Sequence, residues 1–516
     1  MRSTVLWKKR FISVGLILSL MLLIAGCGKG GDDAPFIYLP TSITSANNTI
    51  FTEGTVSTFT VTATGFPTIT FTITGTLPDG VTFDSASGIL SGTPAVGSSG
   101  TYPLTFTASN GISPNATQNF TLTVIETTIT LSNFQNASVV IGQPDFVSNE
   151  VNQGGAAGAN TVARIYGNPL FYNGILYLTD YGNERVLGFN GVPTSNNANA
   201  NFVLGQTDFT TVTAGAGANE MDGPQTFKSY NGKVFVVEYG NSRVLIWNSA
   251  PATTGQPANV VVGQTGFGLS VSDCTQTSLS GPESMEITPG GKLIVADSSN
   301  NRILIWNSIP TTNGTPADIV LGQGDFTHSA GNDDNQDGTA DAAPTARTLS
   351  YPSGIWSDGT RLIVADDYNH RILIWNTFPT SNFTPANVVL GQGDFTNNTE
   401  NDDDQDGTAD AAPTARTLYY PYFLDSNGTQ LFVTDTNNNR VLIWNSIPTV
   451  SFTPANGVLG QGDFTHYAEN DDNQDGSADA VPTARTLYAP TGVYIFGKTL
   501  IVGDNLNYRY LIYRQP

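Results

Sequence analysis

Three short acidic stretches carry oxygen-bearing side chains at a spacing that suits a divalent metal ion. They occupy residues 332–341, 401–410 and 470–479, and each follows the pattern Asp-x-(Asp/Asn)-x-Asp-Gly-x-x-Asp. Oxygens at positions 1, 3 and 5 can converge on a hard cation, the glycine permits a sharp turn, and positions 7 and 9 complete the shell. The pattern therefore predicts calcium binding, at up to three sites. The predicted ligands are Asp333, Asn335, Asp337, Thr339, Asp341, Asp402, Asp404, Asp406, Thr408, Asp410, Asp471, Asn473, Asp475, Ser477 and Asp479.

These stretches resemble the calcium loops of EF-hands, dockerins and thrombospondin-type repeats, with two departures. Position 12, where an EF-hand has a bidentate glutamate, is Pro344, Pro413 or Pro482, and no flanking helix is apparent. We therefore expect weak sites, with dissociation constants on the order of 10⁻⁴ to 10⁻³ M. The alternative is a solvated acidic loop without metal. Repulsion between so many close carboxylates makes that alternative the less favourable one.

The acidic stretches lie within a longer pattern of internal repeats. A hexamer of the form aliphatic-Gly-Gln-x-(Asp/Gly)-Phe recurs at intervals of 58 to 69 residues. An acidic residue five positions before an arginine recurs with it, and a proline opens each unit. Six units of this period indicate a repeat architecture. The hexamers begin at Ile141, Leu204, Val262, Leu321, Leu390 and Leu459; the acid–arginine pairs are Asp180/Arg185, Glu238/Arg243, Asp297/Arg302, Asp366/Arg371, Asp435/Arg440 and Asp504/Arg509; the prolines are Pro169, Pro224, Pro282, Pro352, Pro421 and Pro490.

Each unit contains four candidate strands. In the third unit we expect them near 284–287, 292–296, 302–307 and 318–322, and the third of these is apolar on both faces beyond its arginine. Strands buried on both sides are expected when sheets stack face to face, and four-stranded units around an axis form a β-propeller. The sixth unit carries only three strand patterns, while an unmatched copy of the fourth, at 139–143, precedes the first unit. We expect this copy to complete the sixth blade and close the ring.

The units resemble the NHL-repeat propeller family, whose repeat reads roughly Pro, an apolar strand, and then Val-Ala-Asp-x-x-Asn-x-Arg-Ile. Residues 294–303 and 363–372 match closely, whereas Glu238 and Gly503 depart from the pattern. The resemblance covers residues 128–516 and implies a six-bladed β-propeller.

Two recurring features of the repeat are open to a functional or a structural interpretation. The acid–arginine pairs could be catalytic, but a feature present in every blade favours architecture, with the acid capping a turn and the arginine bridging to it. Four tryptophans share one blade position, and inter-blade core is favoured over a ligand platform. They are Trp247, Trp306, Trp375 and Trp444.

Residues 37–127 alternate apolar and polar positions in short runs. Phe59, Val61 and Ala63 would share one face, and turn residues recur at intervals near ten, which is typical of a β-sandwich. The segment 77–94, which contains Leu-Pro-Asp-Gly-Val-Thr-Phe-Asp and Gly-Ile-Leu-Ser-Gly-Thr-Pro, resembles the bacterial immunoglobulin-like, cadherin-like domain. The predicted fold class is therefore all-β, with an immunoglobulin-like β-sandwich followed by a six-bladed β-propeller.

The N-terminal residues have the order of an export signal. A basic patch at 8–10 precedes an apolar run at 11–24, which at about 14 residues is too short to span a bilayer. The run ends Leu-Ile-Ala-Gly-Cys27, which resembles the lipobox of bacterial lipoproteins. The resemblance implies a signal peptide at 1–26, lipid on Cys27 and a tether at 27–36. In that family Asp after the cysteine favours the inner membrane; Gly28 here indicates an exported protein, lipid-anchored at the outer membrane or cell surface.

Charge and cysteine content exclude several classes of partner and bond. The formal net charge is −22, and loss of the four basic residues in 1–26 would make it about −26. Such a chain repels nucleic acid, so we expect no nucleic-acid partner. The chain has two cysteines, and Cys274 has no candidate partner besides the predicted anchor. We therefore expect no internal disulfide.

The sequence favours a binding scaffold over an enzyme. His328, His370 and His466 do not form a zinc-triad pattern, and neither His-Glu-x-x-His nor Gly-x-Ser-x-Gly occurs. We expect a membrane-anchored surface lipoprotein whose calcium-stabilised propeller binds a protein or a glycan. The alternative is a calcium-dependent hydrolase or lyase with its site in the propeller channel.

Overall fold

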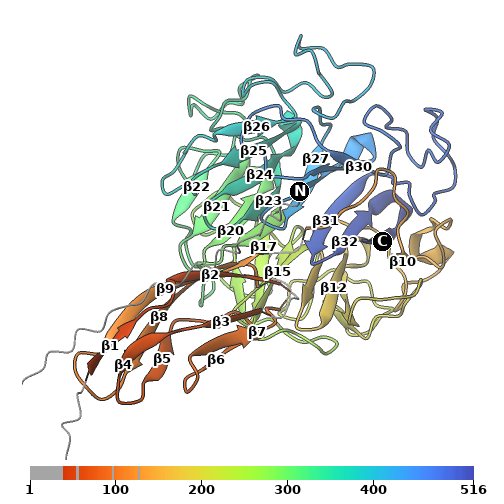
Figure 1. The fold of residues 1–516 in the computed structure, drawn as a ribbon. Helices are drawn as coiled ribbons and strands as arrows, with labels where there is room; N and C mark the ends of the chain where they lie inside the picture. The colour runs from red at the N-terminus through yellow and green to blue at the C-terminus, as the bar shows by residue number, and fades with distance from the viewer. Residues whose placement is uncertain (1–38, 54–56, 96–97, 126–127, 516) are drawn as a thin grey trace, which may run out of the picture.

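The computed structural model describes residues 39–53, 57–95, 98–125 and 128–515, which form an all-β chain of two modules (Figure 1). No α-helix occurs in these residues, and their short helical elements are 3₁₀ turns. None of the helical elements in this part of the chain is long and apolar enough to cross a bilayer. The predicted signal peptide, Cys27 and the tether lie outside the described residues.

The N-terminal module is a sandwich of short strands. One sheet has the order β2-β9-β8-β5, a second has the order β3-β7-β6, and β1 pairs with β4. Phe106 and Phe120 pack at its centre with ring centroids 4.9 Å apart, and both are almost completely buried. The strands are β1 (Leu39–Ile43), β2 (Asn48–Thr52), β3 (Ser57–Thr60), β4 (Ala63–Phe66), β5 (Thr70–Thr74), β6 (Val81–Asp84), β7 (Ile89–Gly92), β8 (Gly100–Ser109) and β9 (Ala116–Ile125).

The predicted alternation in this module is confirmed, with one difference in the strand boundaries. Val61 is buried and Phe59 and Ala63 are partly buried, whereas the threonines between them are exposed. The run is divided between β3, which pairs with β7, and β4, which pairs with β1.

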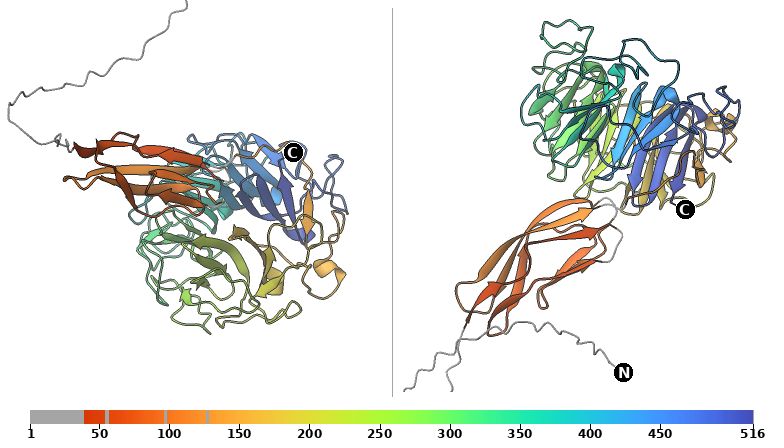
Figure 2. Two further views of the ribbon diagram at one scale, coloured as in Figure 1. Left: turned by 60° about the horizontal axis from the view of Figure 1, so that its bottom comes forward. Right: turned by 45° about the horizontal axis from the view of Figure 1, so that its top comes forward.

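The C-terminal module is a ring of six four-stranded antiparallel sheets, which confirms the six-bladed propeller (Figures 1 and 2). Third strands such as Arg302–Trp306 are buried on both faces, as stacking of sheets requires. Blade 1 contains β11 (Leu170–Tyr172), β12 (Ile175–Asp180), β13 (Arg185–Asn190) and β14 (Phe202–Leu204), and blade 2 contains β15 (Pro224–Tyr230), β16 (Lys233–Glu238), β17 (Arg243–Trp247) and β18 (Val260–Val262). Blade 3 contains β19 (Ser284–Ile287), β20 (Leu293–Asp297), β21 (Arg302–Trp306) and β22 (Ile319–Leu321), and blade 4 contains β23 (Pro352–Ser357), β24 (Leu362–Asp366), β25 (Arg371–Trp375) and β26 (Val388–Leu390). Blade 5 contains β27 (Pro421–Ser426), β28 (Leu431–Asp435), β29 (Arg440–Trp444) and β30 (Gly457–Leu459). The 3₁₀ turns are η1 (Val151–Gly154), η2 (Tyr181–Asn183), η3 (Ser298–Asn300), η4 (Asp367–Asn369), η5 (Thr436–Asn438) and η6 (Asn505–Asn507).

The sixth blade joins the two ends of the ring. It contains β31 (Pro490–Phe496), β32 (Thr499–Asp504) and β33 (Arg509–Arg514), and its outer strand is β10 (Val139–Ile141) from the start of the module. Val140 lies opposite Leu511 in the antiparallel pair, and both side chains are fully buried. The predicted closure by the unmatched strand is therefore confirmed.

Apolar side chains fill the spaces between neighbouring blades. Trp306 packs in a buried cluster formed by blades 2 and 3, and its indole N–H donates to the carbonyl of Thr315 (2.9 Å). Trp247, Trp375 and Trp444 occupy the equivalent positions and are equally buried. The recurring tryptophans are inter-blade core, as the sequence favours.

The acid–arginine pairs are also structural. Asp297 accepts hydrogen bonds from the Ser280 N–H (2.6 Å), the Asn300 amide (2.8 Å) and the Arg302 Nε (2.7 Å). Arg302 then donates to the carbonyl of Phe326 in the hexamer that leaves the blade (2.5 Å). The pair is fully buried, and the other five blades repeat it. Each pair thus ties a blade to the loops that precede and follow it.

The sandwich and the acidic loops lie at opposite faces of the propeller (Figures 1 and 2). Asp79 and Ser98 of the sandwich line a cavity of about 170 Å³ together with Phe171 and Tyr172 at the β11–β12 turn. That turn connects first and second strands. The acidic loops connect fourth strands to first strands, and such connections lie at the other end of an up-and-down blade.

Candidate functional site

The three acidic loops are held against the blades by paired amides. They lie between β22 and β23, β26 and β27, and β30 and β31, at three consecutive junctions between blades. The first residue of the second loop, Asn401, exchanges two hydrogen bonds of 2.9 Å with Asn438 in the turn of the following blade. Asn332 with Asn369 and Asn470 with Asn507 form the same pair. Each loop therefore begins at a buried, fixed position.

Backbone N–H groups shape the start of each loop around its first aspartate. In the second loop Asp402 is buried, and its two carboxylate oxygens accept from the N–H groups of Asp406 (3.1 Å) and Gly407 (2.9 Å). Gly407 has a φ of +84°, so it permits the sharp turn that the pattern predicts. Asp333 and Asp471 make the same two bonds in the first and third loops.

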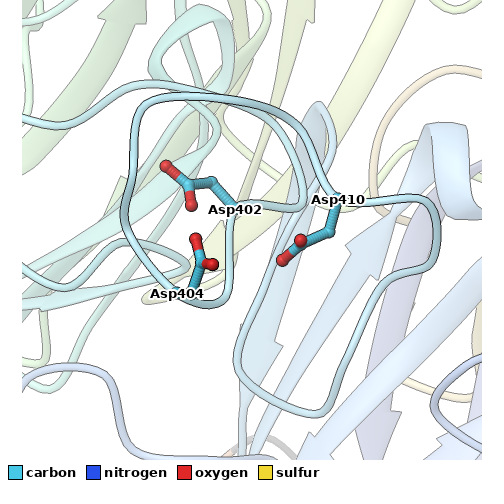
Figure 3. A group of neighbouring side chains, drawn as sticks. All are labelled: Asp402, Asp404 and Asp410. Atoms are coloured by element: carbon cyan, nitrogen blue, oxygen red, sulfur yellow. The ribbon is translucent and has the colours of Figure 1, made fainter.

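The second loop brings three carboxylates together (Figure 3). One oxygen from each of Asp402, Asp404 and Asp410 lies within 4.8 Å of the other two. Asp402 is buried and the other two are exposed, so the group is open to solvent on one side. The charge of Asp406 raises the pKa of Asp404, with smaller contributions from burial and from Asp410 and Asp402. Such a group can hold a metal ion, and hard cations prefer oxygen ligands of this kind.

The first and third loops have the same backbone bonds but a different ligand at position 3. Asn335 and Asn473 stand where the second loop has Asp404, and each accepts from the N–H of the aspartate two residues later (2.9 Å). Position 5 of each loop is exposed, and its carboxylate accepts from the N–H of position 7. These pairs are Asp337 with Thr339, Asp406 with Thr408, and Asp475 with Ser477. The last predicted ligands, Asp341, Asp410 and Asp479, each accept from an N–H near the start of their loop.

One charged pair in each loop was missed by sequence reasoning. The second acid of the first loop, Asp334, accepts two hydrogen bonds from the guanidinium of Arg347 (2.7 and 2.9 Å). This guanidinium also lies over the ring of Phe383, 4.7 Å from its centroid. Asp403 with Arg416 and Asp472 with Arg485 repeat the pair. The recurring Thr-Ala-Arg-Thr-Leu after each loop was the available signal.

A second group of side chains closes the propeller axis on the same face. We call it the tyrosine cluster; it comprises Tyr166, Tyr239, Tyr351, Tyr368, Tyr420 and Tyr422. Tyr351 stacks on Tyr368 with ring centroids 4.7 Å apart, and Tyr368 meets Tyr420 edge-on. Tyr166 of blade 1 contacts Tyr422 of blade 5, at 5.7 Å between centroids. Blades 1 and 5 are separated by blade 6, so this contact joins blades that are not neighbours.

Two buried carboxyl groups are associated with the tyrosine cluster. One oxygen of Glu283 accepts from the hydroxyls of Tyr422 (2.5 Å) and Tyr351 (2.9 Å), and its other oxygen has no hydrogen-bond partner. Asp367 also has a buried carboxylate oxygen without a partner. Burial raises the pKa of Glu283 to about 7. Burial, together with the charge of Glu283, raises the pKa of Asp367 well above its ordinary value.

A second acidic group, on the inner strands, has its own cation. Lys228 pairs with Glu286 at 2.8 Å, and its charge opposes the rise that burial causes in the pKa of Asp425, which is about 6. These side chains come from the inner strands of blades 2, 3 and 5. Among the described residues, the carboxyls of the tyrosine cluster have no comparable lysine or arginine as a cause of their pKa shifts.

The three histidines have different contacts. His328 and His466 each contact the aspartate three residues earlier at 2.8 Å. Burial lowers the pKa of His370 to about 4, so it is neutral, and its Nδ1 accepts from the Tyr420 N–H (3.2 Å). Cys274 is a half-buried free thiol in a loop.

Residues 40–125 match the Putative Ig domain family, in agreement with the immunoglobulin-like module expected there. An immunoglobulin-like module joined to a propeller suggests a surface or binding scaffold. No curated protein matches the chain.

Several solved structures resemble parts of the chain. A putative α-galactosidase from Bacteroides fragilis is 22% identical over 18% of this chain and 20% of that one, with a TM-score of 0.15. A putative phosphatase from Bacteroides thetaiotaomicron is 12% identical over 92% and 96%, with a TM-score of 0.39. Virginiamycin B lyase from Staphylococcus aureus is 13% identical over 69% and 97%, with a TM-score of 0.33. The chain spans about a fifth of the first of these proteins, and likenesses of this size assign no activity.

Proposed function

We propose that this protein is a surface lipoprotein, held on the outer membrane or cell surface by lipid on Cys27, whose NHL-type propeller is a calcium-stabilised scaffold that binds a protein or a glycan. The observation that carries the proposal is the exposed edge of the tyrosine cluster. Tyr368 is 52% exposed although it stacks on Tyr351. A large aromatic side chain that is rigidly packed yet open to solvent is typical of a binding surface.

The position of the two modules supports this function. The sandwich contacts the face of the propeller opposite the acidic loops (Figure 2). The tyrosine cluster lies at the strand ends on the same face as these loops. An anchor that precedes the sandwich in sequence would therefore leave the tyrosine face free to meet a partner. Calcium in the acidic loops would fix the segments that surround this face, since three carboxylates already converge in the second loop.

The experiment is a binding screen with the fragment 28–516 in millimolar calcium, against arrays of glycans and of extracellular proteins. The double variant Tyr368→Ala/Tyr420→Ala is screened beside it. We expect a ligand that the wild type retains and the variant loses. The scaffold function is refuted if the wild type retains nothing above an albumin control, or if every retained ligand is also retained by the variant. Anchoring is tested separately, because Cys27→Ser should abolish incorporation of a labelled fatty acid.

One observation favours a second candidate, a calcium-dependent hydrolase or lyase in the channel. Glu283 and Asp367 have raised pKa values, as general acids do. Their side chains, however, lie buried behind the tyrosine cluster, and a substrate would have to displace these rings. Turnover of ester, peptide or polysaccharide substrates that Glu283→Gln abolishes would favour the enzyme over the scaffold.

A further inference from the structure

The tyrosine cluster combines aromatic rings with two buried carboxyl groups. Its rings come from blades 1, 2, 4 and 5, and the carboxyl of Glu283 comes from blade 3. The Tyr351 hydroxyl links Glu283 (2.9 Å) to Tyr239 (3.3 Å), so five blades meet through hydrogen bonds and ring contacts. All six tyrosines remain partly exposed. The cluster is therefore a continuous surface that opens to solvent on one side and contacts a buried carboxyl group on the other.

The carboxyl oxygens have unused hydrogen-bonding capacity. Glu283 is 1% and Asp367 is 2% exposed, and each has one oxygen without a partner. A buried carboxyl oxygen without a donor is costly, and a positive charge nearby relieves the cost. Some other buried acids of this propeller have such a charge. Asp366, the residue next to Asp367, pairs with Arg371, and the second acidic group contains Lys228.

The chemistry of the surroundings favours an organic cation over a metal ion. A hard divalent cation takes six to eight oxygen ligands, whereas the exposed part of this cluster is aromatic. An ammonium or guanidinium group gains both from ring faces and from a carboxylate behind them. The formal net charge of −22 would further attract a basic partner.

We infer that the tyrosine cluster is a recognition site for a basic side chain of a protein partner. The ammonium or guanidinium group lies against the rings of Tyr368 and Tyr351, and Glu283 and Asp367 supply the counter-charge. The inference rests on the proposed scaffold function and specifies its ligand as a protein with an exposed lysine or arginine. A neutral glycan would use the rings but would give the two buried carboxyl groups no positively charged partner.

The test uses short peptides as probes, because the natural partner is not needed. Acetyl-Gly-Arg-Gly-amide and its lysine counterpart are titrated into the fragment 28–516, and binding is followed by NMR. The neutral probe is the same peptide with citrulline, which keeps the shape of arginine and lacks its charge. Glu150→Gln is the matched control, since Glu150 is an exposed acid on the same face and loses the same charge.

We expect both basic peptides to bind the wild type and the Glu150→Gln variant alike. Tyr368→Ala and Glu283→Gln should each weaken binding by about tenfold, and citrulline should bind weakly or not at all. Tyr368→Ala removes an exposed ring, so its fold can be verified by an unchanged thermal midpoint even where Glu283→Gln disturbs the channel.

Three results would overturn the inference. If Glu283→Gln and Glu150→Gln weaken binding equally, the peptides are held by non-specific electrostatic attraction. If the citrulline peptide binds as well as the arginine peptide, the site does not recognise charge. If a glycan saturates the site and competes for Tyr368, the ligand is a glycan. The screen described above separates this failure from that of the scaffold. If the screen finds a ligand but the basic peptides do not bind, only the recognition of a basic side chain is refuted. If the screen finds no ligand, the scaffold function itself is refuted.

Discussion

Calcium removal should lower the stability of the propeller by an amount that can be worked out from its three acidic loops. With a dissociation constant of about 0.5 mM, calcium at about 5 mM stabilises the folded state by RT ln 11, or about 1.4 kcal/mol per site. Three sites give about 4 kcal/mol. For a propeller of about 380 residues (139–514) the unfolding entropy is about 0.8 kcal/mol/K, so the thermal midpoint should rise by about 5 °C.

The assay is calorimetric unfolding of the fragment 28–516 in calcium, in chelator, and in the same concentration of magnesium. Asp404→Asn is the matched variant, since it gives the second loop the ligand types that the first loop already has. Because affinity depends on ligand charge, we expect the second loop to bind tightest and the variant to weaken it by about tenfold. If calcium and magnesium shift the thermal midpoint equally, or neither shifts it, calcium-specific stabilisation is refuted, and the loops are acidic surface segments without a structural metal.

Three further predictions concern the channel, the turns and the closure. Burial raises the pKa of Glu283 from 4.5 to about 7, so between these values the folded state holds a proton that the unfolded state releases. The wild type should therefore lose roughly 3 kcal/mol of stability as the pH rises from 4.5 to 7. Glu283→Gln, which cannot ionise, should not show this loss in urea titrations. Asp297→Ala leaves the buried guanidinium of Arg302 without a carboxylate and should cost about 3 to 5 kcal/mol, with a smaller loss for Asp297→Asn. Val140→Asp puts a carboxylate into the fully buried ring-closing strand and should cost at least about 3 kcal/mol by denaturant unfolding, whereas the same change at exposed Val212 should cost little.

The propeller could be predicted because its sequence repeats the same pattern six times. A strand limit that is ambiguous in one unit is resolved by the others, and the third blade shows this. Its second strand was expected at 292–296 and spans Leu293–Asp297. The closing strand could be predicted by counting, because the sixth unit lacks a fourth strand and an unmatched copy of that strand precedes the first unit. Structural roles for Asp297 and Trp306 followed in the same way, since what every blade repeats is required by the blade itself.

The tyrosine cluster could not be predicted, because the residues that form it differ from blade to blade. The position after the opening proline is Glu283 in blade 3, Ser353 in blade 4 and Tyr422 in blade 5. No period connects such residues, and their contacts join blades that are not neighbours. Only the closed ring brings them to one axis. The pairing of Asp334 with Arg347 was missed for a related reason, because both residues lie in a connecting loop whose path no strand pattern specifies.

The two candidate sites share a structural connection, which bears on how the face works. Glu400, which immediately precedes the second acidic loop, lies 3.9 Å from the imidazole of His370, and that ring packs edge-on against Tyr420 at 4.6 Å. Asn401 is fixed to the turn of blade 5 by its amide pair. A metal ion that ordered the second loop would therefore restrict the same segment that supports the tyrosine cluster. Coupling between sites is reciprocal, so a partner bound at the rings would in turn favour the ordered loop, and the acidic loops and the rings are better understood as one binding face than as two.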